Sequence, residues 1–429
     1  MMPFAYLPYL TPELPGCGGV LKARPEDFVV EEMPAYDPSG QGEHVYLWIE
    51  KRGLSTPAAM ARLSEASGCR KRSMGHAGLK DAQAVSRQWI SVHTVGEPPF
   101  HQAESDALRI LRVTRHVNKL RVGHLRGNRF MVTVRGVEQP TALAAIFARL
   151  ARQGFPNYYG AQRFGLGGDN AAAGRDLLLA LQAADAAPVR RRRDPLRARL
   201  LLNAYQSALF NALLARRLRA GNVAPEPPDG AADVAPEPAE GGEALPPGFA
   251  CDPLGTLLPG DVAIKHDSGG CFLVQEDNLA DAQGRAAAHL LSPTAPMFGY
   301  KTLRAEGHPG TWEAALLARE GLTPKHFAAG GALAAKGVRR AVRAFADELT
   351  WDVKAEDGAQ ALQLSFTLPR GVYATALLRE VMKPGPRTDG GCAEAPGAPC
   401  ACAASDAAPR TPAASAAVAA IPRTPGARP

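Results

Sequence analysis

Apolar and polar residues alternate along much of the first third of the chain. The alternation is clearest at 43–50 (EHVYLWIE) and 129–135 (RFMVTVR), and the shorter run 28–32 has the same character. A period of two residues predicts strands with one buried face. We therefore expect strands at these positions, another from 88 to about 95, and strands separated by loops through 108–135.

Two helices are predicted among these strands. The first covers 58–66, with Thr56 as N-cap, Pro57 at the first helical position and Gly68 at the end. The second covers 141–153. Because strands outnumber helices here, the pattern favours an α+β arrangement with a mostly antiparallel mixed sheet.

The pattern changes to a helical one after residue 155. Helices are expected at 171–186, at 201–220 and at 311–320, the last capped by Thr311. The stretch 221–250 lies between them and holds seven prolines, six acidic residues and no Lys or Arg. That composition predicts a disordered surface loop, because it offers too little apolar surface to bury.

Strand character returns in the last quarter of the chain. Residues 349–353 and 361–368 read as strands, 373–382 reads as a helix, and 384–429 is expected to be a disordered tail. The Pro- and Gly-rich residues 1–20 read as a loosely packed arm.

The succession of patterns predicts an interrupted fold. A discontinuous catalytic domain would comprise 1–156 and 337–383, and a helix-rich inserted domain would comprise 157–336. We see no internal repeat.

Composition excludes several classes of protein. No run of 18 apolar residues occurs, and residues 1–16 lack the features of a signal peptide, so we expect a cytoplasmic protein without a membrane span. Seven scattered cysteines without framework spacing argue against a disulfide scaffold and against a zinc site.

Positive charge is concentrated in two places. The net charge is +7, and the run 109–135 contains eight basic residues and no acid. A second cluster occupies 190–193 and continues with Arg197 and Arg199. Acid-free basic runs are typical of surfaces that contact phosphates, although solvated faces have the same composition. The eight are Arg109, Arg112, Arg115, Lys119, Arg121, Arg126, Arg129 and Arg135.

The stretch 75–91 (GHAGLKDAQAVSRQWIS) holds the strongest candidate for chemistry. Its small-residue turn delivers Lys80 and Asp81 just before a predicted strand. A carboxylate in such a loop can be held rigidly and still be exposed, as a nucleophile requires. Taken alone, however, Lys-Asp in a turn is usually a solvated surface pair.

Five blocks together resemble the TruD family of tRNA pseudouridine synthases. They are LKARPEDFVVEE at 21–32, GHAGLKDAQAVSRQW at 75–89, LRGNRF at 125–130, PNYYGAQRFGLGG at 156–168 and FTLPRGVYATALLRE at 366–380, in the family's order. The resemblance implies a pseudouridine-synthase-like catalytic domain interrupted by an inserted TRUD domain, with RNA held between them. It also implies isomerisation of uridine to pseudouridine in tRNA, at position 13.

The resemblance assigns roles to individual residues. Asp81 matches the family's nucleophile, and Lys22 matches the basic residue that would keep it ionised. Lys80 more naturally points elsewhere. The candidates for holding a flipped-out base are Phe28, Asn128, Phe130 and Phe366. From the residues alone, the phenylalanines fit a core better than a ligand-facing position, and Asn128 fits a turn after Gly127 equally well. Arg163 could contact phosphate or could link the two domains, and the structural role is favoured.

The expected reaction needs no cofactor, and neither a Walker A motif nor a G-x-G-x-x-G motif occurs. The expected partner is tRNA, with no nucleotide cofactor, no metal and no membrane; a monomer is favoured. Two alternatives stay open: a catalytically silent RNA-binding protein or chaperone on the same fold, and a glycosidase-like hydrolase. The latter needs a second carboxylate, for which Glu26 and Asp27 are the nearest candidates.

Overall fold

The structure is a computed structural model, and it describes most of the chain between residues 7 and 383. The described residues are 7–96, 98–165, 167–182, 194–221, 245–246, 248–329, 331–356 and 358–383. The tail 384–429, the basic cluster 190–193 and most of the loop 221–250 lie outside them. Within the described part, no helix is both long and apolar enough to cross a membrane.

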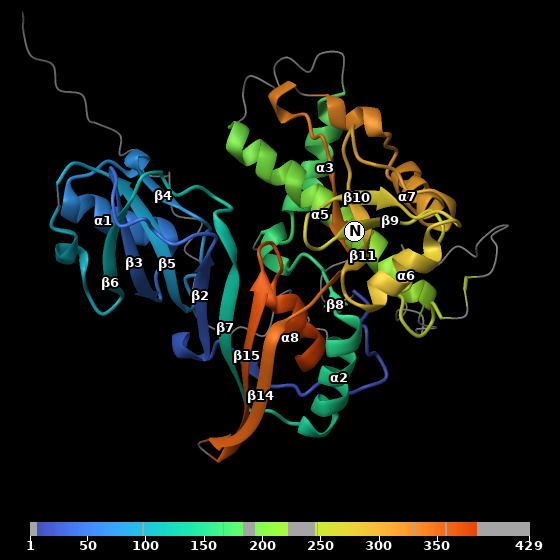
Figure 1. Cartoon of the computed structure of the whole chain (residues 1–429), viewed down its shortest axis with the longest axis horizontal. Helices are drawn as coiled ribbons and strands as arrows, with labels where there is room; N and C mark the ends of the chain where they lie inside the picture. Colours follow the sequence, from blue (N-terminus) through green and yellow to red (C-terminus); the bar gives the residue numbers. More distant parts are fainter. Residues whose placement is uncertain are drawn as a thin grey trace, which may run out of the picture. The chain divides into compact units, whose positions relative to one another are not determined.

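A nine-stranded sheet combines strands from the N-terminal part of the chain with β14 and β15 from its C-terminal described part (Figure 1). Its strands lie in the order β14-β15-β7-β2-β5-β3-β6, with β1 paired to β7 and β4 paired to β5. The pair β2 and β5 is parallel, and the other pairs are antiparallel, which confirms the predicted α+β class with a mostly antiparallel mixed sheet. The strands are β1 (Val20–Leu21), β2 (Phe28–Pro34), β3 (His44–Arg52), β4 (Met74–His76), β5 (Val85–His93), β6 (Leu108–His116), β7 (Leu125–Arg135), β14 (Asp347–Glu356) and β15 (Ala359–Pro369).

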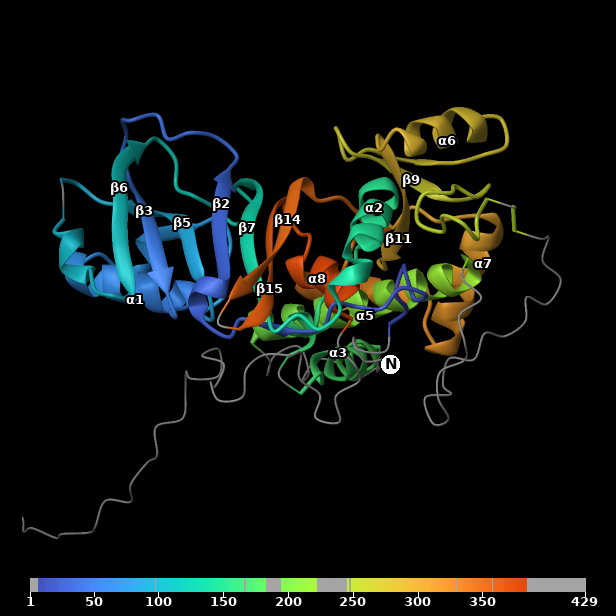
Figure 2. The same cartoon turned by 90° about the horizontal axis from the view of Figure 1, so that it is seen from below.

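Helices cover one face of this sheet in two places. Helix α1 (Thr56–Ser67) packs Ala59 and Leu63 against the inward residues of β3 and β5. Helices α2 (Leu143–Gln153) and α8 (Ala374–Met382) cover β7 and β15, and Figure 2 shows α8 beside β15. The predicted alternation in 129–135 is confirmed, since Phe130, Val132 and Val134 are all buried.

The segment between β8 and β13 contributes further helices and small sheets. Helix α5 is buried along most of its length and packs against α3, α7 and β11. These elements are β8 (Phe155–Pro156), α3 (Asn170–Ala180), α5 (Pro195–Gly221), β9 (Val262–Lys265), β10 (Cys271–Leu273), α6 (Leu279–Ala287), β11 (Leu291–Met297), α7 (Gly307–Arg319), β12 (Val338–Ala341) and β13 (Arg343–Ala344). Strands β10, β9, β11 and β12 form one sheet, and β8 pairs with β13.

Short 3-10 helices complete the described secondary structure. They are Pro25–Asp27, Lys71–Ser73, Phe100–Ala103, Pro140–Ala142, Ala161–Phe164, Pro324–Ala328 and Gly331–Leu333.

Three sequence predictions are corrected by the structure. Helix α1 is capped by Ser55, whose side chain accepts a hydrogen bond from the Ala58 amide, and not by Thr56. Helix α7 begins at Gly307, so Thr311 lies inside it. Phe249, near the end of the predicted loop 221–250, is buried and packs edge-on to Trp312. Only for Phe249 is the deciding partner, Trp312, distant in the sequence.

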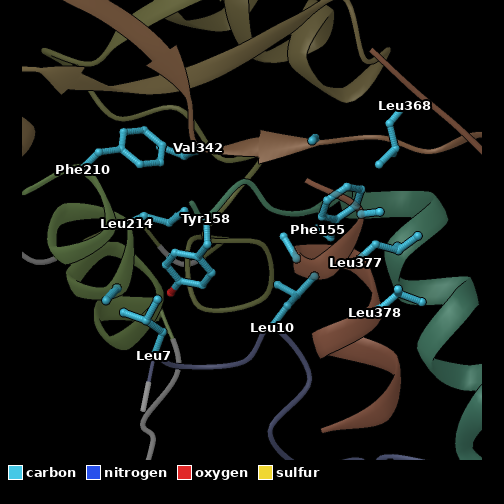
Figure 3. Close-up of a cluster of buried hydrophobic side chains, with 14 of the residues drawn as sticks. Leu7, Leu10, Phe155, Tyr158, Phe210, Leu214, Val342, Leu368, Leu377 and Leu378 are labelled. Atoms are coloured by element: carbon cyan, nitrogen blue, oxygen red, sulfur yellow. The ribbon is translucent and has the colours of Figure 1, made fainter. Parts of the chain in front are cut away.

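The N-terminal arm is also not loosely packed. Leu7 and Leu10 are buried in the core with Phe155, Tyr158 and residues of α5 and α8 (Figure 3). Polar contacts fix the same segment: the Leu10 amide donates to Glu380 Oε2 at 3.0 Å, and Lys383 Nζ donates to Thr11 and Leu14. The arm is therefore a strap across α8, and we call residues 7–18 the N-terminal strap below.

Candidate active site

The loop 77–84, between β4 and β5, presents the candidate aspartate. Because β2 and β5 are parallel, the residues that precede both strands meet at the same end of the sheet. Lys22, which follows β1, and Phe28, the first residue of β2, are thereby brought to the start of β5. Gly75, in β4 just before the loop, packs directly on the Leu120 carbonyl, since a Cβ there would lie 2.2 Å from that oxygen. A Cβ at Gly78 would meet nothing within 4 Å, so close packing does not require a glycine at that position.

Asp81 is held by contacts to both of its oxygens. Lys22 Nζ forms an ion pair with Oδ2, and the Gln83 amide donates to Oδ1 at 3.1 Å. Gln162 Nε2, from the segment before α3, lies 3.4 Å from Oδ2. The Asp81 side chain keeps 30% of its surface exposed, whereas that of Lys22 keeps 2%. The carboxylate is therefore fixed by its neighbours but still reachable from solvent.

The electrostatics keep Asp81 ionised. Burial by itself raises the pKa of its carboxyl, but the charge and hydrogen bond of Lys22 and the Gln83 amide outweigh burial and hold the pKa below its ordinary value. Lys22 also lies over the Phe28 ring, with Nζ 4.7 Å from the ring centroid. Its backbone is left-handed, with φ of 57°, a conformation that a lysine seldom adopts without surrounding contacts.

Lys80 points away from Asp81, as predicted, and has its own partners. Its Nζ lies 3.1 Å from Glu32 Oε2 and donates to Asn128 Oδ1 at 2.7 Å. The Glu32 side chain is fully buried, which raises the pKa of its carboxyl. Since lysine has only donors, the Asn128 amide must face it with its oxygen. The Asn128 NH₂ group then has no protein acceptor among the described residues.

The three candidate aromatic residues form one stack. Phe28 lies edge-on to Phe130 at 5.9 Å, and Phe130 stacks on Phe366 at 5.2 Å. Phe28 is 5% exposed and Phe130 is 7% exposed, whereas Phe366 has no exposed surface. The structure thus brings them together beside Asn128 on the same sheet face. Phe366 lies behind Phe130, where it supports that ring and does not reach the surface.

Several residues behind the loop were not singled out from the sequence. Thr56 Oγ1 accepts from the Lys80 amide at 2.9 Å and donates to Gln88 Oε1. Lys51 has no exposed surface, and its Nζ donates to the carbonyl oxygens of Leu54 and Asp81, each at 2.6 Å.

The alternation patterns do contain a signal for two of the unassigned residues. Lys51 takes the next inward position after Val45, Leu47 and Ile49, and Glu32 likewise follows Phe28 and Val30. A charged residue at an inward strand position requires a buried partner, and here the partners belong to the Asp81 loop.

Arg163 makes structural contacts, but both partners belong to 157–336, so these contacts do not tie the two predicted domains together. Its Nε donates to Ser207 Oγ of α5 at 3.0 Å, and its guanidinium lies 5.4 Å from the Tyr159 ring centroid. For the hydrolase alternative, Asp27 is engaged by Arg135 and Glu26 by Arg52, and among the described residues neither acid is paired with Asp81, so the structure adds no support for a second catalytic acid. Within the described ranges, no group of three or more His, Cys, Asp or Glu side chains is placed to hold a metal.

The fold and the site define an α+β protein with one partly exposed, ionised aspartate beside an aromatic stack and an oriented amide. Comparison with known families agrees with that class. The model of the family described as tRNA pseudouridine synthase D (TruD) matches residues 6–180 and 250–381. The chain belongs to the TruD family.

Individual relatives match over nearly their whole length. The tRNA pseudouridine synthase D of Anaeromyxobacter sp. (strain Fw109-5) is 43% identical over 380 residues, covering 88% of this chain and 96% of that protein. A protein of the same name from Thermus thermophilus is 39% identical, covering 88% and 92%. A crystal structure of a putative TruD protein from Methanosarcina mazei superimposes with a TM-score of 0.67 at 23% identity, covering 88% and 96%, which supports the fold.

Proposed function

We propose that this protein isomerises uridine to pseudouridine in tRNA, with Asp81 as the nucleophile. The observation that carries the proposal is the Lys22–Asp81 ion pair, which leaves the carboxylate charged, fixed and partly exposed in a member of the TruD family. The named relatives are tRNA pseudouridine synthases, and position 13 of the tRNA is the target that the family resemblance implies.

The reaction breaks the uridine C1′–N1 bond and forms a C1′–C5 bond. The hydrogen at C5 is lost and N1 gains one, so atoms balance without an oxidant or reductant. Attack on either the base or C1′ requires an ionised carboxylate, which Lys22 supplies by lowering the pKa of Asp81. No residue of the site has to change its oxidation state.

The uridine must leave its stack before the Asp81 carboxylate can reach it. Phe28 and Phe130 keep only a small exposed surface, 5% and 7%, whereas Phe366, on which Phe130 stacks, keeps none. We propose that this edge of the aromatic cluster receives the base. The Asn128 NH₂ group, fixed by Lys80, is then oriented to donate to a uracil carbonyl oxygen. We propose Phe28, Asn128 and Phe130 as base contacts and Lys22 as the cation that maintains Asp81.

The test compares wild type with Asp81→Asn, which keeps the size of the side chain. Unmodified tRNA is incubated with each protein, and pseudouridine is mapped after carbodiimide treatment. Wild type should form one major product, and the variant should be slower by about 10⁴-fold or more while retaining tRNA binding. A variant that still isomerises would remove Asp81 from its role, and a wild type that binds but never reacts would favour the silent RNA-binding alternative.

A further inference from the structure

Lys51 is a buried cation directly behind the candidate nucleophile. It ends the inward-facing row of β3, and neither its main chain nor its side chain reaches solvent. Its Nζ donates to the carbonyl oxygens of Leu54 and Asp81 at 2.6 Å, and to the Lys80 carbonyl and Ser86 Oγ at 3.3 Å. One ammonium therefore collects oxygens from the β3–α1 turn, the Asp81 loop and β5.

We propose that Lys51 is a positioning residue for the isomerisation: its ammonium holds the main chain at Lys80 and Asp81, and so aims the Asp81 carboxylate. The inference rests on the proposed role of Asp81 but assigns a function to a residue that does not touch the carboxylate itself. The carbonyl of Asp81 is fixed from behind by Lys51, while its side chain is fixed in front by Lys22. Two lysines thus set the main chain and the side chain of one residue separately.

We call the hydrogen bonds from Lys51 to the main chain of the loop the clamp. The number of acceptors around Nζ makes the clamp depend on the Lys51 proton. Four oxygens surround Nζ, and a neutral amine has only two N–H donors where the ammonium has three. The charged groups that face it are the Asp81 carboxylate and the Lys80 ammonium, both from the loop. Leu54 and Leu108, from the turn and from β6, add no charge. Burial lowers the pKa of Lys51 to about 8, so its proton is lost within the range in which the protein can be assayed.

The experiment measures single-turnover rates at saturating tRNA from pH 6.5 to 9.5. For wild type, the rate should fall about tenfold per pH unit above pH 8. Lys51→Met has nearly the same length but no charge. It should lower the rate at pH 7 by about 10- to 100-fold, change the half-saturating tRNA concentration by less than about threefold, and abolish the alkaline decline.

Lys383→Met is the matched control. Lys383 also collects oxygens from a distant segment, Thr11 and Leu14 of the N-terminal strap, but it lies outside the site. Its loss should reduce stability without changing the rate at pH 7 or the alkaline decline. A Lys51→Met rate equal to wild type, or an alkaline decline that survives in that variant, would overturn the proposal.

A second measurement keeps the inference testable if Lys51→Met does not fold. Amide hydrogen exchange of wild-type residues 77–84, corrected for the intrinsic pH effect, should accelerate between pH 7 and pH 9, while exchange in α8 should not. Unchanged protection of the loop would contradict the clamp. A wild type that forms no pseudouridine at any pH would instead contradict the proposed function, and the exchange result would still decide the role of the Lys51 ammonium.

Discussion

Lys80 and Asp81 are adjacent in sequence but take part in separate sets of contacts. Asp81 belongs with Lys22, and Lys80 belongs with Glu32 and Asn128. Both residues lie in the loop 77–84, where Thr56 holds the Lys80 amide and Lys51 holds the Asp81 carbonyl, so each side chain meets a different set of partners. In the proposed reaction, Asp81 would therefore serve the chemistry while Lys80 orients Asn128, the proposed base contact.

Replacing Lys80 with Met should weaken catalysis through Asn128. The Asn128 amide would lose the donor that fixes its orientation, and kcat/KM should fall about 10- to 100-fold, in line with the loss of a charge-assisted hydrogen bond. The measurement is a double-mutant cycle with Asn128→Ala. If the two residues act as a unit, the double variant should be no slower than Asn128→Ala alone. Additive losses would show that Lys80 acts by another route.

Functional residues could be recognised from the sequence only where they belong to a family motif. Asp81 and Lys22 were singled out by the resemblance, and the structure places them in contact. Glu32 and Lys51 were passed over because alternation reveals that a residue faces inward but does not reveal what it meets. Phe366 was expected to touch the base, and its burial behind Phe130 shows how a shared sheet face can hide one member of a stack.

At the scale of elements, α8 does more than cover the sheet. It holds the N-terminal strap through Arg379, Glu380 and Lys383, and the strap leads directly into β1 and Lys22. The main chain joins the two segments as well, since the Cys17 amide donates to the Val381 carbonyl at 3.0 Å. The proline and glycine content of residues 1–20 predicts a loosely packed arm. That prediction is wrong because composition does not reveal a partner 370 residues away in the sequence.

Glu380 gives this contact a pH dependence. Full burial raises the pKa of its carboxyl to about 7, against 4.5 for an ordinary glutamate. The folded state therefore binds a proton more tightly than the unfolded state, and this contribution to stability is complete below pH 4.5 and is lost as pH rises from there through about 7. Glu380→Gln mimics the protonated form and keeps an acceptor for the Leu10 amide.

The Glu380→Gln variant should be more stable than wild type at pH 8 by about 2–3 kcal/mol, with the difference narrowing steadily toward pH 5. Urea unfolding followed at pH 5, 6, 7 and 8 checks the trend. A difference that is constant with pH, or one that grows toward acid, would mean that Glu380 is ionised in the folded protein throughout this range.

At the scale of the whole molecule, most basic side chains of the run 109–135 have partners within the protein, which its composition does not indicate. Arg129 pairs with Glu348, and Arg135 pairs with Asp27 and Glu356. The other engaged members are Arg115, Lys119 and Arg126, each of which donates to a main-chain carbonyl. Acids from distant parts of the chain supply the counter-charges, so a local count of charge could not reveal them.

The remaining three members, Arg109, Arg112 and Arg121, are exposed and have no side-chain partner among the described residues. Replacing all three with Gln should weaken tRNA affinity about 10-fold near physiological salt and reduce the salt dependence, with kcat unchanged. Filter binding across a salt series tests this. Arg129→Gln is the control from the same run, and it should change affinity by less than about twofold because Glu348 already neutralises it. Equal effects from both variants would argue against direct phosphate contact.

The strap on α8 bears on how the protein is made. A ribosome delivers the chain from its N-terminus, so the segment carrying Lys22 emerges long before α8, which completes its anchorage. Until α8 emerges, nascent residues 7–18 lack the surface that they cover in the finished protein. Anchorage of the strap thus becomes one of the last events of biosynthesis. A chain whose translation stops before α8 would leave the strap without this anchor, although β1 could still pair with β7 and hold the segment that leads to Lys22.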